Sequence, residues 1–193
     1  MNNLLPVTRI AFLGNPNTGK SSIGLILSNN TLPSFHIPTP GVQIYSSIIS
    51  NPLLKRNPTK IIIFDLGGLE QLKHYKKYFF DSIDIICLFF AMNDPLSLDN
   101  LKSKWFQEIK ESKDWFLKFE PRISLIGTKG SIKSSISSTK IENIAQSVNA
   151  YKINVISNTD PKNLNDLFTE LINDYYQYKE DKYKVPDDFS DIF

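Results

Sequence analysis

An eight-residue segment near the N-terminus constrains this chain more than any other feature. Residues 14–21 are Gly-Asn-Pro-Asn-Thr-Gly-Lys-Ser, which fits the pattern G-x-x-x-x-G-K-[S/T]. The apolar, β-branched run Val7–Leu13 precedes the segment and the apolar run Ser21–Leu27 follows it, a pattern that predicts a strand, a loop and a helix. Glycines let the main chain wrap closely around an anion, which the N–H groups and the helix N-terminus then face. The predicted phosphate-binding residues are Gly14, Asn15, Pro16, Asn17, Thr18, Gly19, Lys20, Ser21 and Ser22.

Two side chains of this segment have distinct predicted roles. Lys20 supplies a point charge for the β- and γ-phosphates, and Ser21 offers its hydroxyl to Mg²⁺. Pro16 lacks an N–H group, so it removes one possible donor. Asn17 tolerates a positive φ better than most residues do, and we therefore expect the loop to form despite the proline.

The rest of the chain alternates between strand-like and helix-like segments. Strands are predicted at Val7–Leu13, Val42–Ile49, Lys60–Phe64, Ile83–Ala91, Ile123–Ile126 and Ile153–Ile156. Helices are predicted at Leu98–Ile109, which Asp94-Pro95 starts, at Ser138–Val148 and around a last apolar face that includes Leu164, Phe168 and Tyr175. This alternation is typical of an α/β fold, a mostly parallel sheet with helices on both faces. Ligands of such sheets bind at the carboxyl ends of the strands.

The composition narrows the class of protein. The 193 residues include 22 Lys plus Arg and 20 Asp plus Glu, a net charge of +2 that argues against electrostatic binding of nucleic acid. The longest apolar run, around Ile83–Met92, is far shorter than the roughly 20 residues of a membrane helix. We expect a cytoplasmic protein without its own lipid anchor, with one domain at residues 1–178 and a C-terminal extension at 179–193. Cys87 lies in an apolar run, which predicts a buried, inert thiol.

Two loops could complete a metal site beside the phosphate loop. Asp65-Leu66-Gly67-Gly68 follows a predicted strand, so Asp65 is a candidate Mg²⁺ ligand and Gly68 would let the main chain approach a γ-phosphate. Thr39-Pro40-Gly41 precedes the second strand. Thr39 could bind both Mg²⁺ and the γ-phosphate, but a plain turn explains its neighbours equally well.

Two further loops could meet a nucleotide base. Gly127-Thr128-Lys129-Gly130 ends a predicted strand, and Thr128 and Lys129 match the first half of the guanine-binding pattern [N/T]-K-x-D. Ser131 stands where that pattern has its acid, and a neutral hydroxyl cannot replace a charge-assisted pair. Ser157 and Asn158 follow the last strand; they could contact the base from the other side or form a polar loop that caps the last helix.

With these five motifs in this order, the chain resembles the small GTPases of the Ras superfamily. The resemblance implies the P-loop small-GTPase fold with a six-stranded sheet, GTP or GDP with Mg²⁺ as ligand, and protein effectors as partners. It places switch I at Phe35–Gly41 and switch II at Gly67–Phe80, and it assigns the metal to Ser21, Thr39 and Asp65.

Within the superfamily, the chain looks most like the unprenylated Rab-like GTPases of intraflagellar transport. The segments that carry this likeness are Gly14-Asn15-Pro16, Thr39-Pro40-Gly41-Val42, Ile62–Asp65 and Tyr176–Lys182, a Tyr- and Lys-rich end of the last predicted helix. It implies an intraflagellar transport complex as partner and a place in the cilium or flagellum. Septation-signalling GTPases, which share the D-L-G-G and G-T-K segments, are the second candidate.

The chain departs from the superfamily at the residue that orients the attacking water. Leu69 occupies the position of the usual glutamine after D-x-x-G. Leucine has neither donor nor acceptor, so we predict slow hydrolysis and assign no catalytic residue. Three functions stay open at this point: a GTP-dependent switch, a scaffold subunit that uses the fold without a nucleotide cycle, and an adenine-binding ATPase, which the Gly127-Thr128-Lys129 loop disfavours.

Overall fold

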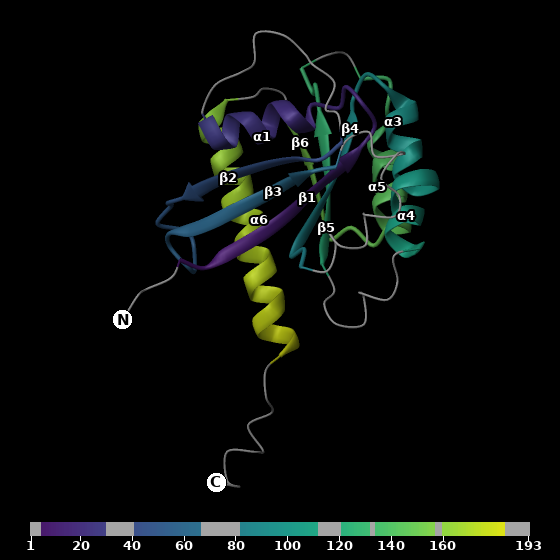
Figure 1. The fold of residues 1–193 in the computed structure, drawn as a ribbon. Helices are drawn as coiled ribbons and strands as arrows, with labels where there is room; N and C mark the ends of the chain where they lie inside the picture. The colour runs from purple at the N-terminus through teal and green to yellow at the C-terminus, as the bar shows by residue number, and fades with distance from the viewer. Residues whose placement is uncertain are drawn as a thin grey trace, which may run out of the picture.

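The computed structural model describes residues 5–29, 41–66, 82–111, 121–131, 134–156 and 160–183. Its centre is a six-stranded sheet in the order β2-β3-β1-β4-β5-β6 (Figure 1). The strands are β1 (Val7–Gly14), β2 (Gln43–Ile49), β3 (Thr59–Asp65), β4 (Ile85–Ala91), β5 (Arg122–Thr128) and β6 (Lys152–Val155). Only the β2–β3 pair is antiparallel among these pairings. The predicted α/β class and mostly parallel sheet are confirmed.

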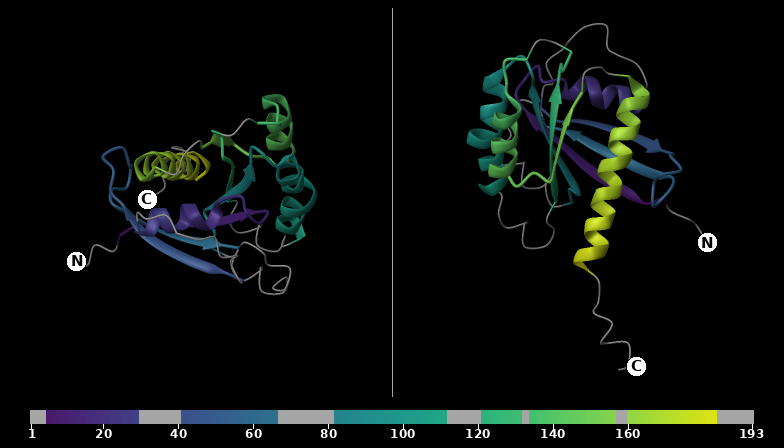
Figure 2. Two further views of the ribbon diagram at one scale, coloured as in Figure 1. Left: turned by 90° about the horizontal axis from the view of Figure 1, so that it is seen from above. Right: turned by 180° about the vertical axis from the view of Figure 1, so that it is seen from behind.

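Helices cover both faces of the sheet (Figure 2). The helical segments described are α1 (Lys20–Asn29), α3 (Pro95–Asn100), the π-helix η2 (Leu101–Trp105), α4 (Phe106–Glu111), α5 (Ser138–Ser147) and α6 (Pro161–Lys182). Alternate residues of each strand point to opposite faces. Ile10 and Phe12 of β1 therefore pack in the cluster with α1 and α6, and Ala11 and Leu13 pack in the cluster with α3, η2, α4 and α5.

The central position of β4 in the sheet explains why the strand is almost wholly apolar. All seven residues of β4 are buried because the strand lies at the centre of the sheet, between β1 and β5. Cys87 is among them, as predicted, and burial raises the pKa of its thiol well above the ordinary value. None of the described helices is both long and apolar enough to cross a membrane.

The last helix includes the Tyr- and Lys-rich stretch Tyr176–Lys182. It continues to Lys182, so residues 179–182, expected as the start of a C-terminal extension, are helical. Contacts of its second half with the body of the domain include a 3.1 Å hydrogen bond between Tyr176 and Thr8, stacking of Tyr178 on the guanidinium of Arg122, and an ion pair between Glu180 and Lys55. These contacts stabilise the helix beyond the end of the apolar face that the sequence shows.

The helical layer after β4 starts at Asp94-Pro95, as predicted. The side chain of Asp94 accepts a hydrogen bond from the Ser97 amide and caps the helix, with proline in the first turn. Its middle is a π-helix, in which the Phe106 amide donates to the carbonyl of Leu101, five residues earlier.

Candidate functional site

The loop between β1 and α1 has the backbone geometry that its glycines predict. Gly14, Asn17 and Gly19 have φ values of 144°, 61° and 83°. A Cβ atom at Gly14 would lie 2.3 Å from the carbonyl oxygen of Phe89 in β4. Glycine is therefore required at position 14 both for its dihedral angle and for the close approach of two strands. Asn17 adopts the positive φ that its residue type tolerates.

The ammonium group of Lys20 lies inside this loop. Its Nζ atom donates to the main-chain carbonyls of Gly14 (2.9 Å) and Asn15 (2.7 Å) and lies 3.2 Å from Thr18 Oγ1. Only 4% of Lys20 is exposed. Burial lowers the pKa of Lys20 from 10.5 to about 8, and the negative charge of Asp65 partly offsets that decrease. A buried cation that is surrounded by neutral carbonyls would form a stronger, charge-assisted hydrogen bond with an incoming phosphate.

The predicted metal ligands Ser21 and Asp65 are brought together. Ser21 Oγ, in the first turn of α1, donates a 2.5 Å hydrogen bond to Asp65 Oδ2 at the end of β3. The carboxylate is buried because β3 pairs with β1, where Asp65 is opposite Phe12. A hydroxyl and a carboxylate are hard oxygen ligands of the kind that Mg²⁺ takes. Among the described residues no three His, Cys, Asp or Glu side chains form a metal cluster, so such an ion would also need phosphate or water oxygens.

Tyr45 of β2 is a neighbour of this pair that the sequence did not indicate. Its ring packs on α1 at Gly24, where a Cβ atom would lie 2.5 Å from two ring carbons. Its hydroxyl donates to Gln43 Oε1 at 2.8 Å. Burial, reinforced by the charge of Asp65, raises the pKa of Tyr45 to about 12 although a hydrogen bond with Ser21 opposes the shift. Strand alternation alone predicts that Tyr45 is buried, but not what it contacts.

The predicted base loop closes against the phosphate loop. Thr128 Oγ1 donates a 3.0 Å hydrogen bond to the carbonyl of Thr18, and a Cβ atom at Gly19 would lie 3.6 Å from the Thr128 methyl carbon. Lys129 follows with a φ of 58°, and Ser131 is exposed.

The remaining predicted site residues lie outside the described residues: Thr39, Gly68, Ser157 and Asn158, together with Leu69 and most of both switch segments.

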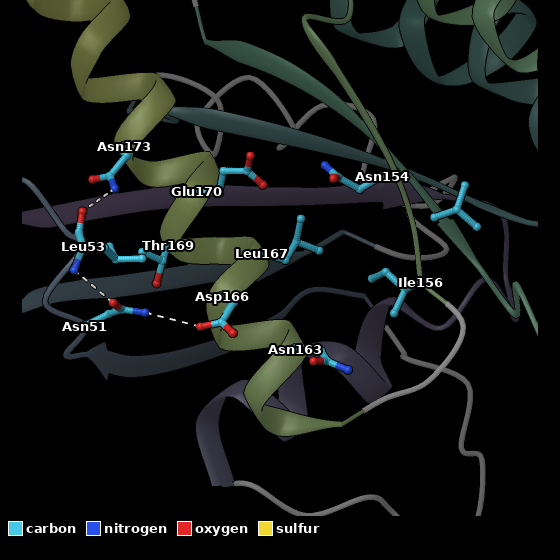
Figure 3. A pocket seen from close by; sticks show the side chains of 11 residues that line it. Asn51, Leu53, Asn154, Ile156, Asn163, Asp166, Leu167, Thr169, Glu170 and Asn173 are labelled. Carbon is cyan, nitrogen blue, oxygen red and sulfur yellow. Dashed lines mark hydrogen bonds between the residues drawn. The ribbon is translucent and has the colours of Figure 1, made fainter.

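A separate cavity of about 810 Å³ lies along α6, away from the phosphate loop (Figure 3). Amide and carboxylate side chains from three elements line it: Asn51 in the β2–β3 connection, Asn154 on β6, and Asp166 and Glu170 on α6. Asn51 Nδ2 donates to Asp166 Oδ1 at 3.4 Å. Two carboxylates facing one cavity disfavour a phosphate group, so this cavity does not compete with the phosphate loop as the nucleotide site.

Comparison with known proteins agrees with this geometry. Residues 9–177 match the Ras family. A GTP-binding RHO-like protein of Candida albicans is 24% identical over 174 residues, which are 89% of this chain and 47% of that protein. GTP-binding protein rho4 of Schizosaccharomyces pombe is 24% identical over 69% of this chain and 62% of its own length. The Rho-related GTP-binding protein RhoD of Homo sapiens is 22% identical over 65% and 55%.

The chain spans less than two thirds of the length of each of these relatives. The match to the family, however, covers the sheet, the phosphate loop, the Ser21–Asp65 pair and the base loop together. This chain therefore belongs to the Ras family of small GTPases.

Proposed function

We propose that this protein binds GTP or GDP with Mg²⁺ at the phosphate loop and acts as a slowly hydrolysing switch on protein partners. The observation that carries the proposal is the buried Lys20 ammonium, held by loop carbonyls beside the Ser21–Asp65 pair. The three relatives described above are named as GTP-binding or Rho-like proteins, which supports the choice of nucleotide.

Each side chain has a role in this proposal. Lys20 contacts the β- and γ-phosphates, and Ser21 and Asp65 hold the metal, with Thr39 as a further proposed ligand. When bound, Mg²⁺ neutralises phosphate charge. The aliphatic part of Lys129 lies along the base. Because Ser131 cannot accept two guanine protons as a carboxylate does, we propose weaker discrimination between guanine and other purines than an aspartate would give.

Slow hydrolysis is proposed from Leu69, since a leucine side chain cannot orient an attacking water. A single-turnover assay of bound GTP compares the wild-type chain with Leu69→Gln. We expect faster hydrolysis in the variant. Equal and fast rates in both proteins would show that Leu69 does not limit the reaction.

The first experiment is to purify the protein without added nucleotide, denature it and identify the released compound by chromatography. Stoichiometric GTP supports guanine binding and slow turnover together. Stoichiometric GDP supports guanine binding but contradicts slow turnover. Lys20→Ala is the control, because it should lose the nucleotide; wild-type occupancy in that variant would place the site elsewhere.

A scaffold role is the second candidate, favoured by Leu69 and Ser131, which both weaken a nucleotide cycle. Binding of a captured partner is compared between protein loaded with GDP and protein loaded with a non-hydrolysable GTP analogue. A switch binds its partner differently in the two states, whereas a scaffold does not. An empty preparation in the first experiment would also favour the scaffold.

The cellular role is a finer proposal, supported by the subgroup segments such as Thr39-Pro40-Gly41-Val42 and Ile62–Asp65. We propose a cytoplasmic protein that joins an intraflagellar transport complex in the cilium or flagellum, with septation signalling as the alternative. Affinity purification of the tagged chain from its own cells tests this. Transport-complex subunits support the first role, and septum-associated proteins support the second.

A further inference from the structure

The side chain of Asn15 links the phosphate loop to the helical layer on one face of the sheet. Its Oδ1 atom accepts a 2.9 Å hydrogen bond from the indole Nε1 of Trp105 and a 3.3 Å hydrogen bond from Nδ2 of Asn100. We propose that Trp105 and Asn100 are positioning residues that hold the phosphate loop through Asn15 and slow nucleotide release. This inference rests on the proposed function, because it assumes that a nucleotide occupies the loop.

The π-helix explains how two helical residues reach one oxygen atom. Asn100 and Trp105 are five positions apart. In an α-helix such residues point about 140° away from each other around the axis. In η2 the Phe106 amide bonds to the carbonyl of Leu101, five residues earlier, and this wider turn brings positions five apart toward one face. An uninterrupted α-helix at this place would present only one of the two donors to Asn15.

The burial of Trp105 makes this link rigid. Trp105 is 2% exposed and packs in the apolar cluster that contains Leu98 and Leu101. A buried indole has little freedom to turn away, and its N–H would lose a hydrogen bond if Asn15 moved. The Asn15 side chain is therefore fixed before any ligand arrives.

The main chain of Asn15 connects this link to the ammonium group of Lys20. The Asn15 carbonyl accepts from Lys20 Nζ at 2.7 Å and from Thr18 Oγ1 at 2.8 Å. One residue thus contacts the helical layer with its side chain and Lys20 with its carbonyl. Releasing the side chain frees the main chain at the point where the ammonium is held, so we expect an effect on nucleotide retention as well as on stability.

The test is the rate at which labelled GDP is released in excess unlabelled GDP and Mg²⁺. Trp105→Phe keeps an aromatic ring but removes the N–H, and Asn15→Ala removes the acceptor. Each change should accelerate release about five- to tenfold, the effect of losing one hydrogen bond. The double variant should release no faster than the faster single variant, because both changes remove the same link. Rates that multiply in the double variant would overturn the proposal.

Phe106→Leu is the matched control, since Phe106 lies in the same apolar cluster and its side chain has no group that could donate a hydrogen bond to Asn15. It should lower the unfolding midpoint without changing release. A Trp105→Phe variant that loses stability but releases GDP at the wild-type rate would show a merely structural role.

A second measurement does not require the tryptophan variant to fold. In a Trp115→Phe background Trp105 is the one remaining indole, and its N–H resonance is followed by NMR. Asn15→Ala should shift this resonance, and an unchanged resonance would overturn the link. Failure of the wild-type chain to retain any GDP would instead contradict the proposed function, and the role of the Asn15 link with it. Retention of GDP with unchanged release in both variants contradicts the role of the link alone.

Discussion

The hydroxyl of Thr128, the last residue of β5, donates a 3.0 Å hydrogen bond to the main-chain carbonyl of Thr18 in the phosphate loop. The same hydroxyl lies 3.2 Å from the carbonyl of Phe90 in β4. One side chain therefore joins the predicted base loop to the predicted phosphate loop. Both loops are at the carboxyl ends of parallel strands, where ligands of such sheets bind.

Thr128→Val tests this link, because valine keeps the branched shape and removes the hydroxyl. The buried carbonyl of Thr18 would lose this partner, so we expect the free energy of unfolding to fall by about 1–2 kcal/mol. Urea denaturation measures the change. Thr139→Val on the exposed face of α5 is the control and should stay within about 0.5 kcal/mol of wild type. An equal decrease in the free energy of unfolding in both variants would show that the Thr128 hydrogen bond does not contribute to stability.

Gly24→Ala tests the contact between α1 and β2. The new methyl group would lie 2.5 Å from two carbons of the Tyr45 ring, so one element must shift, at a cost of about 1–3 kcal/mol. Alanine otherwise favours a helix over glycine, so a stabilised variant would mean that the ring moves freely. Adding Tyr45→Leu should recover part of the lost stability, because a smaller side chain leaves room for the methyl group. Thermal denaturation of the single and the double variant measures both effects.

Local motifs at the ends of predicted strands indicated which described residues the candidate site brings together. The phosphate loop follows from eight consecutive residues, and the Ser21–Asp65 pair follows from two motifs at the carboxyl ends of neighbouring strands. Both are consequences of parallel strand geometry, which a hydrophobic pattern reveals. The role of Asn17 also follows from residue type, since asparagine is one of the few residues that adopts a positive φ.

Contacts between distant side chains could not be predicted in this way. The Trp105–Asn15 bond joins residues 90 positions apart and depends on a π-turn, whereas helical periodicity assumes an α-helix. The C-terminal part of α6 looked like a charged extension because its anchors are tyrosines and ion pairs rather than aliphatic residues. Tyr176 and Glu180 meet partners in β1 and in the β2–β3 connection, and nothing in the local sequence indicates those partners.

Removal of the metal tests the Ser21–Asp65 pair. EDTA should accelerate release of labelled GDP from the wild-type protein, because Ser21 and Asp65 would hold the proposed ion, and the ion would neutralise phosphate charge. In Ser21→Ala the same addition should change the rate little, since release is already fast with Mg²⁺ present. Ser28→Ala removes a hydroxyl from α1 that donates to the helix carbonyl of Leu25, and it should respond to EDTA as wild type does. A wild-type rate indifferent to EDTA would contradict the metal assignment.

The lowered pKa of Lys20 predicts how pH affects the empty protein. Burial lowers this pKa from 10.5 to about 8. Below pH 8 the lysine is charged in both the folded and the unfolded chain, so its contribution does not change with pH, and burial of the charge disfavours the folded chain. Between about pH 8 and 10.5 the unfolded chain binds more protons than the folded chain, so the Lys20 contribution to stability rises with pH. Urea denaturation of wild type and Lys20→Met over this window should show that rise in the wild-type chain alone.

A bound phosphate reverses the sign of this effect. Its negative charge favours protonated Lys20 and raises the pKa again, so the nucleotide complex binds more protons than the empty protein. Near pH 9, binding of GDP should therefore take up a proton, and affinity should fall as pH rises through about 8. Calorimetry in two buffers that differ in ionisation enthalpy measures the uptake. Lys20→Arg stays charged throughout, so it should lose this uptake, and equal uptake in the two proteins would assign the proton to another group.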